Sequence, residues 1–210
     1  MALNTNSIWI SIEYRLSPEF KHPIGFNDCK YVFEYVCNNK SLFSTDKAKL
    51  GISGDSCGAH YSALLSNQYY SIIDYQIFIY GAFNLFDKYP SHFEMNKDCF
   101  LLTDKVADFY KSNFLREDQL NEETLKNEKI SPYFKQSFEF LPKTLLIAAE
   151  LDIIRDQSVE YFKKLQKHKV ESELRIIKGV LHGFFSYPIQ MKKAHEEAMS
   201  YIVNFINSSI

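Results

Sequence analysis

The 210-residue sequence has little glycine, no long apolar run and no excess of charge of either sign. Its 7 glycines exclude collagen-like and other glycine-rich repeats. No apolar run approaches the roughly 18 residues that a membrane-spanning helix needs, and the first residues have neither the basic nor the long apolar region of a secretory signal. Because 24 lysines and arginines nearly balance 26 aspartates and glutamates, the net charge is −2, and we expect no binding to nucleic acid or to an anionic membrane.

The cysteines and histidines form no pattern typical of a metal site or a disulfide framework. The four cysteines are Cys29, Cys37, Cys57 and Cys99, and no two of them are separated by only two residues. The six histidines have no metal-ligand spacing with cysteines or acidic residues. We therefore expect no metal, no cofactor and reduced thiols, as in a reducing compartment.

The composition, 46% hydrophobic and 24% charged, is that of one globular domain with a sizeable core. Strand and helix signals alternate along the chain, which predicts an α/β fold with a mostly parallel sheet and flanking helices. The expected strands are residues 8–14, 49–53, 75–80, 144–149 and 173–177. The expected helices begin at Pro23 and after Gly58, the second running to about Gln68, and span 156–168 and 189–206.

Residues 87–141 interrupt this alternation. They are more polar than the rest of the chain and far longer than a strand-to-strand crossover requires. A helix is predicted to start near Thr103, with one apolar face made of Val106, Phe109, Tyr110 and Phe114. We interpret the segment as a cap inserted into a single domain that spans residues 1–210.

The strongest local signal is Gly54-x-Ser56-x-Gly58 between an expected strand and an expected helix. In that context the serine lies on a sharp turn, its hydroxyl exposed at the carboxyl end of the sheet, and the N–H of Cys57 can face a developing oxyanion. Ser56 is therefore the predicted nucleophile. A plain tight turn, or the thiol of Cys57 as nucleophile, is the alternative interpretation.

A serine nucleophile needs a base and an acid that orients the base. Asp152 follows the expected strand 144–149, and His182 follows the last expected strand, so the order is serine, acid, histidine. That order is typical of the α/β-hydrolase fold. Asp156 is a rival acid, placed where it would also favour the first turn of a helix. His60 is expected on the helix after Ser56, where it lines the pocket or points away from it.

Four blocks of the sequence resemble the arylacetamide deacetylase and hormone-sensitive lipase group of α/β-hydrolases. They are Tyr14-Arg-Leu-Ser-Pro-Glu19, Gly54-Asp-Ser-Cys-Gly58, Glu150-Leu-Asp-Ile-Ile-Arg-Asp156 and His182-Gly-Phe184. The resemblance implies hydrolysis of carboxylic esters by the same three residues. It also implies that residues 87–141 cover an acyl or aryl pocket, with Phe109, Tyr110 and Phe184 as expected substrate contacts.

The sequence departs from that group in two ways. Cys57 stands where the group has alanine, a mild change because the backbone N–H, and not the side chain, is the group that donates to the oxyanion. No His-Gly-Gly loop, which completes the oxyanion hole in the group, occurs in the chain, and Met1 lies only seven residues before the expected strand 8–14. We expect the chain to be the C-terminal two-thirds of such a hydrolase. A strand expected between 8–14 and 49–53 would then be missing, so those two pair directly or leave an unpaired edge.

The sequence thus predicts a serine carboxylesterase, similar to a lipase-like deacetylase, with a small-molecule ester as its partner. Loss of one oxyanion donor typically lowers turnover about 100- to 1000-fold, so we expect weak activity. The alternatives are a ligand-binding or interaction protein without catalysis on the same fold, and a peptidase. The oligomeric state stays open. The chain as written fits the cytoplasm, and an anchor in preceding residues would place the protein at the endoplasmic reticulum membrane.

Overall fold

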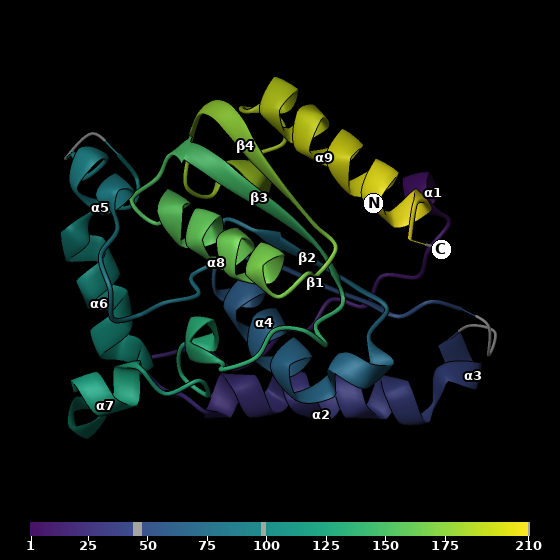
Figure 1. Cartoon of the computed structure of the whole chain (residues 1–210), viewed down its shortest axis with the longest axis horizontal. Coiled ribbons are helices and arrows are strands. Elements are labelled where there is room, and N and C mark those ends of the chain that lie inside the picture. Colours follow the sequence, from purple (N-terminus) through teal and green to yellow (C-terminus); the bar gives the residue numbers. More distant parts are fainter. Residues whose placement is uncertain (44–47, 98–99, 210) are drawn as a thin grey trace.

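The structure is a computed structural model that describes residues 1–43, 48–97 and 100–209, and in these residues four parallel strands form one sheet (Figure 1). The order β1-β2-β3-β4 across the sheet is also the order along the chain. The strands are β1 (Gly51–Asp55), β2 (Tyr75–Ile79), β3 (Lys143–Leu151) and β4 (Ser172–Leu181). The predicted α/β class with a parallel sheet is confirmed.

The central strands β2 and β3 are buried on both faces. All of β2 and residues 144–149 of β3 are buried, and both segments are nearly continuous apolar runs. Such runs are typical of parallel strands covered by helices on both sides. The outer strands β1 and β4 are more exposed, and they match the predictions at 49–53 and 173–177 with shifted ends.

Helices of very different lengths surround the sheet. The longer ones are α2 (Ile24–Asn38), α4 (Cys57–Tyr69), α6 (Asp104–Phe114), α8 (Arg155–Lys167) and α9 (Lys192–Asn207). The shorter ones are α1 (Ala2–Thr5), α3 (Lys40–Phe43), α5 (Pro90–Glu94) and α7 (Glu122–Leu125). Single 3-10 turns are η1 (Tyr70–Ile72), η2 (Glu117–Gln119), η3 (Pro132–Phe134) and η4 (Phe184–Ser186). The predicted helices are confirmed within a few residues.

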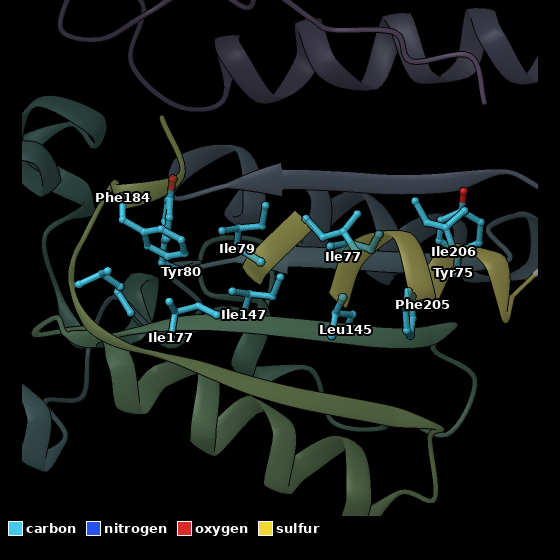
Figure 2. Close-up of a cluster of buried hydrophobic side chains, with 14 residues drawn as sticks. Tyr75, Ile77, Ile79, Tyr80, Leu145, Ile147, Ile177, Phe184, Phe205 and Ile206 are labelled. Atoms are coloured by element: carbon cyan, nitrogen blue, oxygen red, sulfur yellow. The ribbon is translucent and has the colours of Figure 1, made fainter. Parts of the chain in front are cut away.

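Apolar side chains join the helices to both faces of the sheet. On one face α9 packs against β2 and β3 through Phe205 and Ile206 (Figure 2). On the other face α4 and α8 pack around Phe78 and Leu146, and α2 packs on α4 at the side away from α8. This arrangement leaves the carboxyl ends of the strands as the place where polar residues gather, as in other open α/β sheets.

The described part of the segment 87–141 contains α5, α6, α7, η2 and η3. Figure 1 shows α5, α6 and α7 following one another along one side of the molecule. Helix α6 begins after Thr103, as predicted, and the hydroxyl of Thr103 accepts a hydrogen bond from the N–H of Val106 at 3.4 Å. The role of this segment as a cap stays a prediction.

Three cysteines of the described residues, Cys29, Cys37 and Cys57, are free thiols, and Cys99 lies outside these residues. In the same part of the chain no group of three histidine, cysteine or acidic side chains could hold a metal ion. None of its helices combines the length and the apolar character that crossing a membrane requires.

The predicted strand at 8–14 is wrong. Residues 7–16 form no strand in the structure, and Ile8 is 63% exposed. Only Ile12 and Tyr14 pack on the core, beside α2 and α4. A β-branched run becomes a strand only when a neighbouring strand supplies its hydrogen bonds. In the described residues β1 pairs with β2 alone, so direct pairing of 8–14 with 49–53 does not occur and the outer edge of β1 is unpaired.

Candidate active site

Ser56 lies on a strained turn between the end of β1 and the start of α4. Its φ of 50° and ψ of −116° belong to a region that residues other than glycine rarely adopt. The turn is held by hydrogen bonds from the N–H of Ser56 to the carbonyl of Ile79 at 2.9 Å and from the N–H of His60 to the carbonyl of Ser56 at 3.1 Å. The strain therefore persists because β2 and α4 fix the turn from both sides.

Two glycines flank this turn, and only one of them is required by close packing. A Cβ at Gly54 would lie 2.2 Å from the carbonyl carbon of Gly58, which is backbone and cannot move aside. A Cβ at Gly58 would have nothing within 4 Å. The first glycine thus lets the strand pass directly against the start of the helix.

This difference predicts opposite effects of the same substitution. Gly54→Ala is expected to lower the free energy of unfolding by about 3 kcal/mol or more, because the turn must open to admit the methyl group. Gly58→Ala is expected to leave it unchanged or to raise it by up to about 1 kcal/mol, since alanine is the better helix former. Urea unfolding of both variants measures this. Equal losses in both variants would contradict the close approach of β1 and α4.

The structure brings the three residues predicted for catalysis into one chain of hydrogen bonds. The Oγ of Ser56 lies 2.8 Å from Nε2 of His182, and Nδ1 of His182 lies 2.7 Å from Oδ2 of Asp152. A carboxylate only accepts, so Nδ1 carries the proton and Nε2 is free to accept from the serine hydroxyl. This is the arrangement in which an imidazole can take a proton from a serine.

Each partner is held at the carboxyl end of its strand. Asp152 follows β3 directly, is 1% exposed, and its Oδ1 accepts a hydrogen bond from the N–H of Ile154 at 3.0 Å. His182 follows β4, and the next residue, Gly183, turns the chain with a φ of 81°. The carboxylate is therefore buried with two partners, while the imidazole sits beside the serine.

Two residues near the imidazole were not found by sequence reasoning. The ring of Tyr80, 1% exposed, lies 4.9 Å from the ring of His182, and its hydroxyl donates to Asp55 at 3.2 Å. A Cβ at Gly183 would lie 3.5 Å from the side chain of Leu101, which brings the segment 87–141 next to the histidine. No sequence motif identifies Tyr80 or Leu101, because only the tertiary fold places them close to His182.

The rival acid Asp156 is engaged elsewhere. Its carboxylate accepts from the N–H of Ser91 at 2.8 Å and from the guanidinium of Arg155 at 2.8 Å. Burial opposes ionisation, but these hydrogen bonds outweigh it and hold the pKa of Asp156 below its usual range. Of the two candidates, Asp152 is the one hydrogen-bonded to His182.

The other candidates from the sequence have different surroundings. His60 is buried on α4 and its Nδ1 donates to the carbonyl of Ala82 at 2.7 Å, and burial lowers its pKa to about 4. Cys57 is exposed as a residue, but desolvation of its thiol raises the pKa, although hydrogen bonds with the hydroxyls of Tyr14 and Tyr61 oppose this. A thiol with a raised pKa is a poor nucleophile near neutral pH, which favours Ser56.

The three expected substrate contacts are not brought together. Phe184 is 1% exposed and belongs to the core between the sheet and α9, where Figure 2 shows it beside Tyr80. Phe109 and Tyr110 are 63% and 61% exposed on α6. Their contact with a substrate stays a prediction.

A sequence profile described as the α/β hydrolase fold matches residues 1–186. The chain belongs to this family. It is 27% identical to an arylesterase of Saccharolobus solfataricus, covering 85% of this chain and 58% of the relative, and 22% identical to arylacetamide deacetylase of Bos taurus, covering 98% and 66%. An esterase structure from Pyrobaculum calidifontis is similar with a TM-score of 0.88 and 29% identity, over 99% of this chain and 67% of that one.

The match to arylacetamide deacetylase confirms the resemblance drawn from the four sequence blocks. The chain spans only part of the curated proteins it is similar to, from 51% of a Moraxella protein named lipase 2 to 66% of the deacetylase. The family match over residues 1–186 establishes the fold and the family for this part of such proteins.

Proposed function

We propose that the protein is a serine hydrolase that cleaves carboxylic esters. The observation that carries the proposal is the hydrogen-bonded chain from Ser56 through His182 to Asp152 at the carboxyl end of the sheet. The strained position of Ser56 supports it, because strain of this kind occurs where the surrounding structure needs a particular geometry. Relatives named carboxylesterase, arylesterase and lipase give independent support.

In this mechanism the Oγ of Ser56 attacks the ester carbonyl while Nε2 of His182 takes its proton. Asp152 keeps the imidazole in the required tautomer and stabilises the imidazolium. The tetrahedral intermediate collapses, and the alcohol leaves with the proton from His182. Water then attacks the acyl-serine with His182 again as base, which releases the acid and restores the serine.

The N–H of Cys57 is the proposed donor to the oxyanion. Cys57 is the first residue of α4, and the first N–H groups of a helix have no carbonyl partner within the helix. The same end of the helix carries the positive end of its dipole, which favours a developing negative charge. No His-Gly-Gly sequence occurs among the 210 residues, and the N–H of Cys57 is a donor that these residues offer.

The substrate class we propose is small esters with an apolar acyl or aryl group. Residues 87–141 act as a cap in this proposal, and Leu101 of that segment already lies against Gly183 beside the histidine. Leu102 packs on Ile153 and Ile154, which follow the acid directly. An apolar cap over the serine would exclude water and favour apolar groups.

Turnover of an ester and its matched amide tests the proposal. Purified protein is expected to release nitrophenol from p-nitrophenyl butyrate, to act far more slowly on the corresponding nitroanilide, and to lose this activity with an organophosphate. Saturable binding of the ester without turnover would contradict the proposal and favour a binding protein on the same fold. Faster cleavage of the amide would favour a peptidase.

A further inference from the structure

A buried serine in α5 joins the segment 87–141 to the loop that carries Asp152. Ser91 is 0% exposed, and its hydroxyl donates to the carbonyl of Ile153 at 2.9 Å. The same hydroxyl accepts from the N–H of Asp156 at 3.1 Å, and the N–H of Ser91 donates to the carboxylate of Asp156 at 2.8 Å. Ser91 is therefore fixed by three hydrogen bonds to the residues just after β3.

The hydroxyl of Ser91 is one peptide group away from the acid. The carbonyl of Ile153, which accepts from Ser91, and the N–H of Ile154 belong to the same planar peptide. That N–H donates to Oδ1 of Asp152 at 3.0 Å, while Oδ2 of Asp152 bonds Nδ1 of His182 at 2.7 Å. Ser91 thus bonds the carbonyl of this peptide, and the N–H of the same peptide bonds the carboxylate of Asp152.

The side chains that pack around this peptide are mostly apolar, and the N–H of Asp156 beside it is already bonded to the hydroxyl of Ser91. Ile153 and Ile154 are buried with Leu102, and Met95 and Val106 pack against them from the segment 87–141. Ile153 is 1% exposed, so its carbonyl is cut off from bulk water if it loses its donor, and rotation of the peptide towards another partner lowers the cost of the lost hydrogen bond. Rotation of that plane would carry the N–H of Ile154 away from Asp152.

We propose that Ser91 is a positioning residue for the carboxylate of Asp152, acting through the peptide between Ile153 and Ile154. The inference rests on the proposed function, since it assigns Ser91 a part in the reaction of Ser56. It also makes α5 a part of the catalytic arrangement, so a displacement of α5 weakens the hold on the acid. Asp156, in the same account, keeps Ser91 in place and does not itself orient the histidine.

Ser91→Ala tests this with a matched control. The substitution removes the donor to the carbonyl of Ile153 and the acceptor of the Asp156 N–H, while the N–H of Ser91 that donates to the carboxylate of Asp156 remains. Ser158→Ala is the control, because Ser158 is also 0% exposed and lies on α8, but in the described part of the chain its hydroxyl has no hydrogen-bond partner. Ser91→Cys, which keeps a weak donor at the same position, is the second variant if the alanine protein does not fold.

The measurements are kcat and KM for p-nitrophenyl butyrate and the proton resonance of His182 Nδ1 in protein labelled with ¹⁵N-histidine. Ser91→Ala is expected to lower kcat about 10- to 100-fold with KM within about twofold, because a small misplacement of a positioned group costs this much. The Nδ1 resonance is expected to shift or broaden in Ser91→Ala, with a smaller change in Ser91→Cys. Ser158→Ala is expected to change neither measurement.

Three outcomes overturn the inference. Ser91→Ala could match Ser158→Ala in kcat and in the resonance, or it could raise KM alone, which would make Ser91 an anchor of α5 only. An unchanged resonance with a fallen kcat would also exclude an effect through Asp152. Failure of the proposed function is distinguishable from these outcomes, because the unsubstituted protein would then show no turnover. The effect of Ser91 on the Nδ1 resonance of His182 could still be measured in that case.

Discussion

Replacing Asp152 by asparagine is expected to lower kcat for an ester by about 10⁴-fold. The amide oxygen or nitrogen of asparagine fills the same space, but the imidazole is no longer held with its proton on Nδ1. The asparagine oxygen still accepts from the N–H of Ile154, so its NH2 group takes the place of Oδ2 and donates to Nδ1 of His182. This favours the wrong tautomer, in which Nε2 carries a proton and cannot accept one from Ser56. The effect appears in kcat, because the histidine acts after the ester is bound.

Asp156→Asn is the matched control for this result. Asp156 is four residues further along the chain and its carboxylate bonds Ser91 and Arg155. Its loss is expected to lower kcat less than about tenfold, through a weaker hold on α5, since one exchanged hydrogen bond is worth only about 1 kcal/mol. Measuring kcat for both variants against p-nitrophenyl butyrate decides between the acids. A larger loss of kcat in Asp156→Asn than in Asp152→Asn would make Asp156 the acid that orients the histidine.

The second large effect is expected from Ser56→Ala. Without the hydroxyl no acyl-enzyme can form, and turnover is expected to fall by about 10⁶-fold, to what a site without its nucleophile retains. Cys57→Ala is the control, because alanine keeps the backbone N–H proposed to face the oxyanion and starts a helix well. That variant is expected to retain kcat within a few-fold.

The pair of variants also separates the two nucleophiles that the sequence leaves open. If turnover survived in Ser56→Ala and vanished in Cys57→Ala, the thiol would be the nucleophile. The raised pKa of the Cys57 thiol argues for the opposite result, since little thiolate is present near neutral pH. Initial rates with p-nitrophenyl butyrate, corrected for the rate with heat-treated protein, give the turnover of both variants.

Local patterns sufficed where the fold also supplies the partners that the pattern requires. The apolar runs of β2 and β3 have strands on both sides, the glycine-serine-glycine turn is predicted from its own residues, and the order of Ser56, Asp152 and His182 follows from which strand each one ends. The separation of Asp152 from Asp156 is of another kind. Asp152 lies between β3 and α8 and Asp156 in the first turn of α8, and only the tertiary hydrogen bonds reveal that one reaches His182 and the other Ser91.

The errors and omissions have the same physical origin. Residues 8–14 have the composition of a strand, but strand formation depends on a neighbour that supplies hydrogen bonds, and the described residues offer none at that edge of β1. Phe109 and Tyr110 follow Val106 at helical spacing, yet both are exposed, because which face of α6 is covered depends on packing that the spacing does not contain. Only the tertiary fold places Tyr80 and Ser91 near the triad, and no local sequence pattern indicates this.

Labelling with a fluorophosphonate shows whether the hydrogen-bonded triad activates the hydroxyl of Ser56. Native protein is incubated with the probe, digested and analysed by mass spectrometry, with urea-unfolded protein and His182→Ala protein as controls. The account predicts one label per chain, on the peptide that contains Ser56, and none in either control. Labelling that persists after unfolding, or that falls on any other residue, would contradict it.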